Sequence, residues 1–162
     1  MLKRGFEPIF NNESEVLILG SFPSKMSFEI GFYYGNPRNR FWKMLQDFFK
    51  VELVSVEAKK DFLLHYRIAL WDIVCLGSNM QGDKESSMDK TLLATEISDL
   101  EELLAKTQIK TILCNGKKAY FLLNKYYPHL KDMAKSLPST SPANVGFDSK
   151  QWEVELVSKS NF

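Results

Sequence analysis

Residues 20–42, GSFPSKMSFEIGFYYGNPRNRFW, combine aromatic rings, positive charge and neutral amides in one Gly- and Pro-broken segment that is too polar for a helix. Exposed aromatic rings near basic side chains can stack on a nucleobase while the charges hold its phosphate backbone. Phe22 and Tyr34 flank the turn-forming Pro23 and Gly35, so we expect them to face a ligand. The other large rings are predicted to pack the segment onto the core: Phe28, Phe32, Phe41 and Trp42.

Two polar residues are candidates for catalysis. Asn39 has a neutral amide, which cannot act as a strong base but can orient a water molecule or hydrogen-bond to a base. The alternative for Asn39 is an N-cap or turn residue ahead of a helix that contains Phe41. Asp72 is a carboxylate in an otherwise apolar run, and for it we favour a structural hydrogen bond to the neighbouring loop.

Two further segments offer groups that suit phosphate. Asn115 and Gly116 precede an expected helix, whose free N–H groups and Lys117 could face an anion, although a plain strand-to-helix turn is the favoured alternative. Segment 137–144, LPSTSPAN, carries three hydroxyls on a chain stiffened by two prolines, and hydroxyls suit phosphate oxygens. Three polar residues of another stretch are interpreted as loop residues only: Ser86, Ser87 and Asp89.

Residues that usually bind metals are scarce in this chain, which has 2 His and 2 Cys. Cys75 and Cys114 both lie in apolar runs, where we expect buried thiols. The sequence has no metal-ligand cluster of the usual spacing. It therefore predicts no metal site and no cofactor.

Length and composition are those of a globular protein. The 162 residues, 44% hydrophobic and 25% charged, predict one domain over residues 1–162. No apolar run approaches the ~20 residues that span a bilayer, and the N-terminal residues lack the apolar stretch of a signal peptide. We therefore expect an intracellular, cytoplasmic protein without membrane contact.

The net charge is only +1, but its distribution is uneven. Residues 20–43 have four basic residues against one Glu, and residues 115–162 have seven Lys against four acidic residues, whereas residues 44–114 are acidic. Two basic segments could converge on one face and meet a polyanion. The alternative is that these lysines are solvated on helix surfaces.

Apolar runs alternate with helix-like segments along the chain. Four runs predict strands: 15–20, 68–76, 109–116 and a short one at 133–137. Five segments predict helices: 38–50, 55–67, 98–107, 117–127 and 148–160. We assign Ser55 as an N-cap, Ser98 and Glu101 as a capping box, and Pro128 as the end of a helix.

This alternation predicts an α/β fold of three layers, α/β/α, around a central, mainly parallel four-stranded sheet. The strands are nearly continuous apolar runs, as in a sheet covered on both faces. Ligands of such sheets bind beyond the carboxyl ends of the strands. Four segments should therefore meet there: 20–42, 77–91, 115–118 and 137–144.

Five motifs in order resemble the uracil-DNA glycosylase superfamily: a Gly-x-x-Pro turn after the first strand, NPRNRFWKML, LWDIV, ILCNGKKAY and LPSTSPAN. NPRNRFWK is similar to mismatch-specific uracil-DNA glycosylases, and GSFPS with YYGNPRNRFW and LPSTSPAN is most similar to hypoxanthine (deoxyinosine) DNA glycosylases. The resemblance covers roughly residues 15–147. It implies a uracil-DNA glycosylase-like fold, and an enzyme that flips a damaged base out of DNA and hydrolyses its N-glycosidic bond without a metal.

The resemblance also assigns roles. Asn39 matches the asparagine of the family's HPxN stretch and would be catalytic, whereas the usual His of that stretch is Asn36 here. Phe22 stands where several relatives carry Asp, Glu or Asn, so it can stack but cannot orient water. Base contacts are expected from Gly20, Ser21, Phe22, Pro23, Ser24, Tyr34 and Asn115. DNA contacts are expected from Lys25, Arg38, Arg40, Lys117, Ser139, Thr140, Ser141, Pro142, Ala143 and Asn144. Segment 142–147 is a candidate to fill the gap that the flipped base leaves.

We therefore expect a monofunctional DNA glycosylase of base excision repair that removes hypoxanthine first and uracil second, and that works as a monomer. Two alternatives remain open. One is a damaged-DNA-binding module with weak or no catalysis, which Phe22 and Asn36 make plausible. The other is an N-glycosidic hydrolase of free nucleosides, which would not need the two basic segments.

Overall fold

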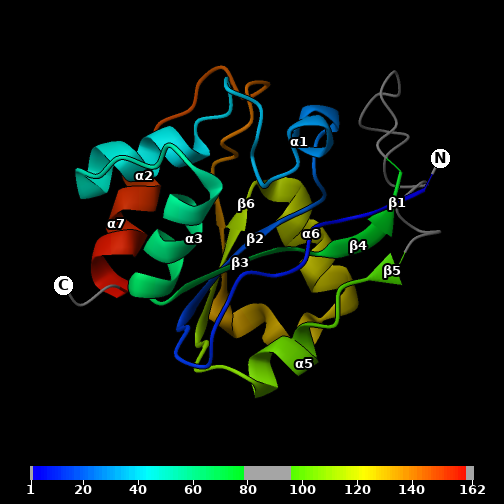
Figure 1. Cartoon of the computed structure of the whole chain (residues 1–162). Coiled ribbons are helices and arrows are strands. Elements are labelled where there is room, and N and C mark those ends of the chain that lie inside the picture. Colours follow the sequence, from blue (N-terminus) through cyan, green and yellow to red (C-terminus); the bar gives the residue numbers. More distant parts are fainter. Residues whose placement is uncertain (1, 79–95, 160–162) are drawn as a thin grey trace.

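The computed structural model describes residues 2–78 and 96–159, and a four-stranded parallel sheet forms its centre (Figure 1). The strand order is β3-β2-β6-β7. The strands are β2 (Val16–Gly20), β3 (Ile68–Asp72), β6 (Thr111–Asn115) and β7 (Ala134–Leu137). This sheet confirms the predicted fold class.

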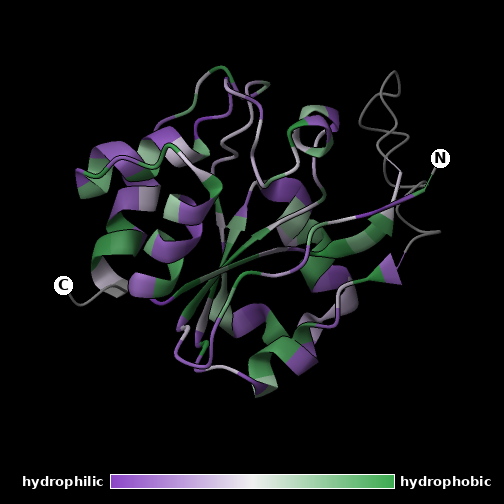
Figure 2. Cartoon of the chain, viewed as in Figure 1, coloured by the Kyte–Doolittle hydropathy of each residue, from purple (hydrophilic) through white to green (hydrophobic). Residues whose placement is uncertain are grey.

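Helices cover both faces of the sheet. They are α1 (Lys25–Ile30), α2 (Phe41–Phe49), α3 (Val56–His65), α5 (Leu100–Ala105), α6 (Lys117–Tyr126), the 3-10 helix η1 (Pro128–Met133) and α7 (Lys150–Lys159). Because successive strand residues point to opposite faces, Ile18 of β2 packs in the cluster with α2, α3 and α7, while Leu17 and Leu19 pack with α5 and α6. Figure 2 shows the central strands in mainly hydrophobic colours, as burial on both faces requires.

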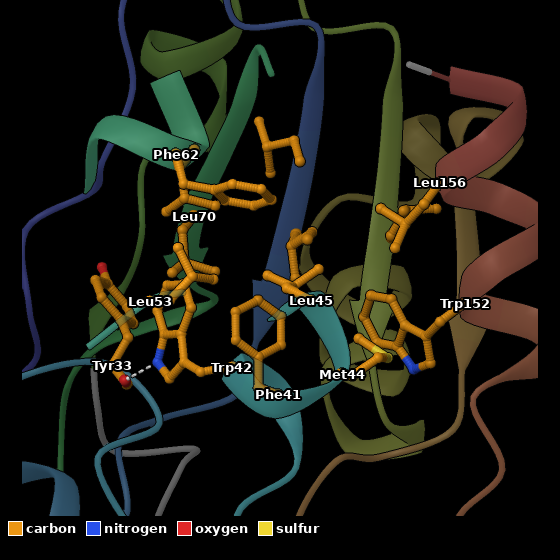
Figure 3. Packing of buried hydrophobic residues seen from close by; sticks show 14 of the residues in the cluster. Tyr33, Phe41, Trp42, Met44, Leu45, Leu53, Phe62, Leu70, Trp152 and Leu156 are labelled. Carbon is orange, nitrogen blue, oxygen red and sulfur yellow. Dashed lines mark hydrogen bonds between the residues drawn. The ribbon is translucent and has the colours of Figure 1, made fainter. Parts of the chain in front are cut away.

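The core on the α2 side is rich in aromatic rings (Figure 3). Phe41 and Trp152 are completely buried, and the indole N–H of Trp42 donates to the carbonyl oxygen of Tyr33 at 2.8 Å. Phe32 and Trp42 are also buried, as predicted. Phe28 is only half-buried, and its ring packs against those of Phe6 and Phe22.

The predicted strand 68–76 is broken into two strands that belong to different sheets. After β3, the N–H of Ile73 donates to Gly20 O at 2.8 Å, and the chain then leaves the parallel sheet. The second part, β4 (Val74–Gly77), lies in an antiparallel sheet between β1 (Lys3–Arg4) and β5 (Glu96–Ile97). This smaller sheet was not predicted, because the apolar run continues across the break. Its outer position also leaves Cys75 half-exposed, so only Cys114 is the buried thiol that we expected.

Two local predictions are wrong and one is confirmed. Segment 20–42 does contain a short helix, α1, because the Ser24 hydroxyl caps it and Gly31 ends it with a φ of 91°. Helix α5 is capped by Asp99, whose side chain accepts from Glu102 N–H, rather than by Ser98. Ser55 caps α3 as predicted. Most of the predicted loop 77–91, including Ser86, Ser87 and Asp89, lies outside the described residues.

No helix in the described part of the chain is both long and apolar enough to cross a bilayer.

Candidate active site

A cavity of about 520 Å³ lies at the carboxyl ends of β2, β3 and β6. Parallel pairing places these ends together, since Gly20 of β2 is in register with Asp72 of β3, and Leu19 with Cys114 of β6. Fifteen of the predicted site residues line it: Gly20, Ser21, Phe22, Pro23, Ser24, Tyr34, Arg38, Asn39, Asn115, Lys117, Ser139, Thr140, Ser141, Pro142 and Ala143. The other three, Lys25, Arg40 and Asn144, are not among its lining residues.

Asn39 is held by a tight turn on the cavity wall. Asn36 O accepts from Asn39 N–H at 2.8 Å, and the Asn36 side chain accepts from Arg38 N–H at 2.9 Å, as expected for a turn with Asn first and Pro37 second. The Asn39 oxygen Oδ1 accepts from Phe41 N–H at 2.9 Å. Its Nδ2 has no hydrogen-bond partner among the described residues. The amide is thus oriented through its oxygen, as the turn alternative predicted, and has its donor group available.

The floor of the cavity is formed where Gly20 leaves room for two polar side chains. A Cβ atom at position 20 would overlap Asp72 Oδ1 and lie 2.8 Å from the Tyr34 hydroxyl oxygen. Only Gly therefore fits here. The Asp72 side chain and the Tyr34 hydroxyl converge on the same point.

Asp72 is 5% exposed, and burial raises the pKa of its carboxyl to about 7. We expected it to make a structural hydrogen bond. The structural hydrogen bond in the structure is made instead by the backbone carbonyl of Asp72, which accepts from the Ser98 hydroxyl at 2.6 Å. The carboxyl itself lines the cavity, where it is the only acidic side chain among the described lining residues.

Tyr34 adopts a φ of 53°, which is unusual for a residue with a side chain. Its hydroxyl is buried and has no hydrogen-bond partner within the described part of the chain. Burial, and then the nearby Asp72, raise the pKa of this hydroxyl, so it stays protonated; Asn115 offsets the rise in part. Asn115 bonds to Thr140 through both ends of its amide, so it has only its second Nδ2 hydrogen to offer the Tyr34 oxygen, and the hydroxyl's own hydrogen is left without an acceptor among the described residues.

One wall carries the Phe22 ring, which packs against Phe28 with ring centroids 5.4 Å apart. The wall is tied together by Ser27, a buried residue that sequence reasoning missed. The Ser27 hydroxyl bonds to Ser24 Oγ at 3.0 Å and accepts from Gly35 N–H at 3.1 Å. The Ser-x-x-Ser spacing of a helix cap was the available signal.

The opposite wall is the loop of residues 138–147, which β6 holds in place. Asn115 Nδ2 donates to Thr140 Oγ1, and Thr140 N–H donates to Asn115 Oδ1, both at 3.0 Å. Gly116 has a φ of 101°, and a Cβ there would lie 3.1 Å from Ser139 Cβ. Asn115 therefore braces the loop instead of presenting a free amide.

Arg40 supports the same loop from the α2 side. Its Nη1 donates to the carbonyl oxygens of Ser141 at 2.9 Å and Asn144 at 3.0 Å, and its guanidinium lies over the Phe147 ring. Asn144 in turn donates to Ser139 O at 2.9 Å. These contacts explain why Arg40 and Asn144 lie outside the cavity lining.

Positive groups from both basic segments reach the cavity. Arg38 lines it from one side, and Lys117 and Lys118 from the other. Both lysines begin α6, whose N-terminus has no side-chain cap and so leaves backbone N–H groups unbonded within the helix. Among the residues that the structure describes, no three His, Cys, Asp or Glu side chains are placed to hold a metal ion.

Six lining residues were not among the predicted site residues: Ser27, Tyr33, Asn36, Asp72, Gly116 and Lys118. Asp72 had a usable signal, since it is a lone carboxylate that ends an apolar strand. Tyr33 had no such signal, because its sequence pattern is that of a core residue. In the structure its hydroxyl donates to the backbone oxygens of Phe6 and Glu7.

Comparison with known proteins places this chain among DNA glycosylases. The family model of the uracil DNA glycosylase superfamily matches residues 7–159. A hypoxanthine DNA glycosylase of Methanosarcina acetivorans is 38% identical over 94% of this chain and 97% of the relative. One of Methanosarcina barkeri is 33% identical over 89% of each. The solution NMR structure of a candidate uracil DNA glycosylase from M. acetivorans is similar with a TM-score of 0.79 and 36% identity, over 96% of this chain and 97% of that one.

Proposed function

The chain belongs to the uracil DNA glycosylase superfamily, and on that basis we propose that it is a monofunctional DNA glycosylase that removes hypoxanthine first, and uracil second, from DNA. Two relatives of nearly the same length carry the name hypoxanthine DNA glycosylase. The observation that carries the proposal is the single cavity that joins the Asn39 amide, the Phe22 ring and the Asp72 carboxyl under a positively charged rim.

The cavity suits a base that has been turned out of the duplex. A flipped base can stack on an aromatic ring and be held by polar groups at its edge, and here Phe22 and the floor residues would supply these contacts. Arg38, Lys117 and Lys118 would neutralise the flanking phosphates. Positioning a reactant in this way lowers the barrier by replacing a bimolecular encounter with an oriented complex.

Asn39 would orient the attacking water. The water oxygen forms a bond to C1′ as the C1′–N bond breaks, the electron pair of that bond leaves with the base, and the proton that the water loses passes to the departing base or to solvent water. An amide cannot take the water's proton as a strong base, so the residue acts by position. Its bond to Phe41 N–H supports this role because it fixes the amide before substrate arrives.

The loop 138–147 would enter the duplex. Val145 is 90% exposed, as an apolar group that fills the place of a flipped base must be before binding. The N–H groups of Ser141 and Ala143 are already bonded to serine hydroxyls. Phosphate contacts from this loop would therefore come from the hydroxyl hydrogens of Ser139 and Ser141.

We further propose that the enzyme acts as a monomer, without a cofactor, and inside the cell, where its DNA substrate is found. A monomer fits a protein that must approach DNA alone. The oligomeric state and the cofactor requirement can be tested with the purified protein, and the location by fractionating cells.

A labelled duplex with one deoxyinosine or deoxyuridine, incubated with the protein and then treated with alkali, tests the proposal. We expect strand scission at deoxyinosine, less at deoxyuridine and none in the undamaged duplex. Tight binding without scission would identify a damaged-DNA-binding module. Hydrolysis of free inosine that does not respond to salt would identify a nucleoside hydrolase, since duplex binding must weaken steeply as salt rises.

A further inference from the structure

The floor of the cavity contains two polar side-chain groups that the proposed cleavage step does not use. They are the carboxyl of Asp72, at the end of β3, and the hydroxyl of Tyr34, from the segment before α2. Both approach the point that a Cβ atom of residue 20 would occupy. They therefore lie close together beside Gly20, which lines the cavity.

The Tyr34 hydroxyl is an unsatisfied buried group. It has no hydrogen-bond partner among the described residues, and the residue is held at a positive φ. A buried hydroxyl without a partner destabilises a folded protein, and most buried polar groups have one. Such a group at the floor of a cavity indicates that a ligand completes its bonding.

The groups around Asp72 determine its protonation state. Tyr33 and Tyr34 approach it from the segment before α2. Cys114 lies on β6, which β2 separates from β3, and Arg38, Lys117 and Lys118 line the cavity. The cations favour the carboxylate, but burial favours the neutral acid and raises the pKa to about 7. The tyrosines cannot supply charge to the site, because burial and Asp72 raise the pKa of both.

We propose that Asp72, in its protonated form, and Tyr34 donate hydrogen bonds to the O6 and N7 acceptors of a flipped hypoxanthine. This inference rests on the proposed function and names the edge by which its base is recognised. Both O6 and N7 are acceptors in a 6-oxopurine, whereas adenine has an amino donor at position 6. A carboxylate has only acceptors, so an ionised Asp72 would repel this edge.

The sign of the pH dependence follows from this role. The protonated acid is the active form, so recognition is complete well below pH 7 and is lost as pH rises through the raised pKa of Asp72. Above that value the fraction of protonated acid falls about tenfold for each pH unit. An Asp72→Asn variant keeps a donor that does not titrate, so this pH dependence should disappear.

The experiment measures binding and release separately. Binding uses a duplex with 2′-fluoro-deoxyinosine, which resists hydrolysis, and release uses single-turnover kinetics on deoxyinosine, both between pH 5.5 and 8. For the wild type we expect Kd to weaken and the rate to fall, each by about tenfold, across this range. For Asp72→Asn we expect a rate about tenfold below wild type at pH 6 and a flat profile, and for Tyr34→Phe a reduced affinity with the wild-type profile.

A wild-type rate that rises with pH would overturn the inference, since Asp72 would then act as a carboxylate base. So would an Asp72→Asn variant that keeps the wild-type profile. A second probe does not depend on how the variants fold: 7-deazadeoxyinosine lacks the N7 acceptor, and the wild type should bind its duplex about tenfold more weakly at pH 6. Equal affinity for the two duplexes would also contradict the inference. If the wild type releases no hypoxanthine, the proposed function fails, while the binding data still decide the role of Asp72.

Discussion

The segment 20–42 and the loop 138–147 face each other across the cavity, and they use their polar groups in opposite ways. In the loop, the backbones of Thr140, Ser141 and Asn144 are bonded to other parts of the protein. In the segment, the Tyr34 hydroxyl has no partner among the described residues, and Asn39 is bonded there through Oδ1, which leaves its Nδ2 as a donor. Unsatisfied donors belong where a ligand will bind, and satisfied ones belong where shape must be kept. The difference places the proposed chemistry on the segment, whereas the backbone of the loop is held in shape and only the hydroxyl hydrogens of Ser139 and Ser141 remain for DNA.

Asn39→Ala is the strongest test of that division. It removes the amide that would orient the water, and we expect the single-turnover rate on deoxyinosine to fall at least about 100-fold, the loss typical of one positioned polar group. Duplex affinity should change little. Asn39→Asp keeps the acceptor for Phe41 N–H but replaces the donor with a carboxylate that can act as a base, so it tests whether the amide donor is needed. An Asn39→Ala enzyme with wild-type rates would place the chemistry elsewhere.

Gly20→Ala tests the crowded floor and has a control in the opposite loop. The new Cβ would overlap Asp72 and press on Tyr34, so we expect a loss of about 1–3 kcal/mol in the free energy of unfolding and weaker binding of the base. Gly146→Ala meets nothing within 4 Å and should change stability by no more than about 0.5 kcal/mol. Chemical denaturation measures both. Similar losses of stability in the two variants would contradict the steric overlap that we infer at position 20.

Substitutions of Arg40 and Arg38 distinguish a side chain that supports the loop from one that contacts DNA phosphates. Arg40→Ala removes two hydrogen bonds to loop carbonyls, and we expect a loss of about 1–3 kcal/mol in stability. Arg38 is exposed and lines the cavity, so Arg38→Ala should leave stability intact and weaken DNA binding. The slope of log Kd against log salt should become less steep by about one. A normal salt slope in Arg38→Ala would exclude its phosphate contact.

Val145→Ala should have the smallest effect. Val145 is 90% exposed, so stability should not change measurably. If the side chain fills the place of the flipped base, release from duplex DNA should slow a few-fold while release from single-stranded DNA stays the same. Equal slowing on the two substrates would contradict a role in the duplex.

The fold could be predicted because three of its four parallel strands, from Val16–Gly20 to Thr111–Asn115, are mainly apolar runs separated by helix-like segments. The break at Ile73 was not predicted, although the lone carboxylate of Asp72 stands directly before it, because the run is apolar on either side of these two residues. Nor was α1, which has six residues and begins at a serine cap. Apolar periodicity identifies a long helix, whereas a short one depends on its caps.

The site could be predicted in part. Topology placed the segment 20–42 beyond the end of the first strand, which brought Phe22 to the cavity, and the family resemblance singled out Asn39 within it. The direction of a side chain was not predictable where it depends on a distant partner. The backbone carbonyl of Asp72 accepts the hydrogen bond from Ser98. Arg40 donates to carbonyl oxygens about a hundred positions away in the chain. Long-range contacts of this kind leave no local pattern.

The bonds between Asn115 and Thr140 have a consequence for the thermodynamics of association. Thr140 is completely buried, so this part of the loop is fixed to the sheet before DNA arrives. Ordering a residue costs about 1–2 kcal/mol of conformational free energy. Here the residues become ordered when the protein folds, before DNA binds. Binding of DNA then has no such cost for the anchored residues, and more of the contact energy is left to unstack a base. We therefore expect the anchored loop to act as a rigid wedge whose shape is the same in the free and the bound enzyme.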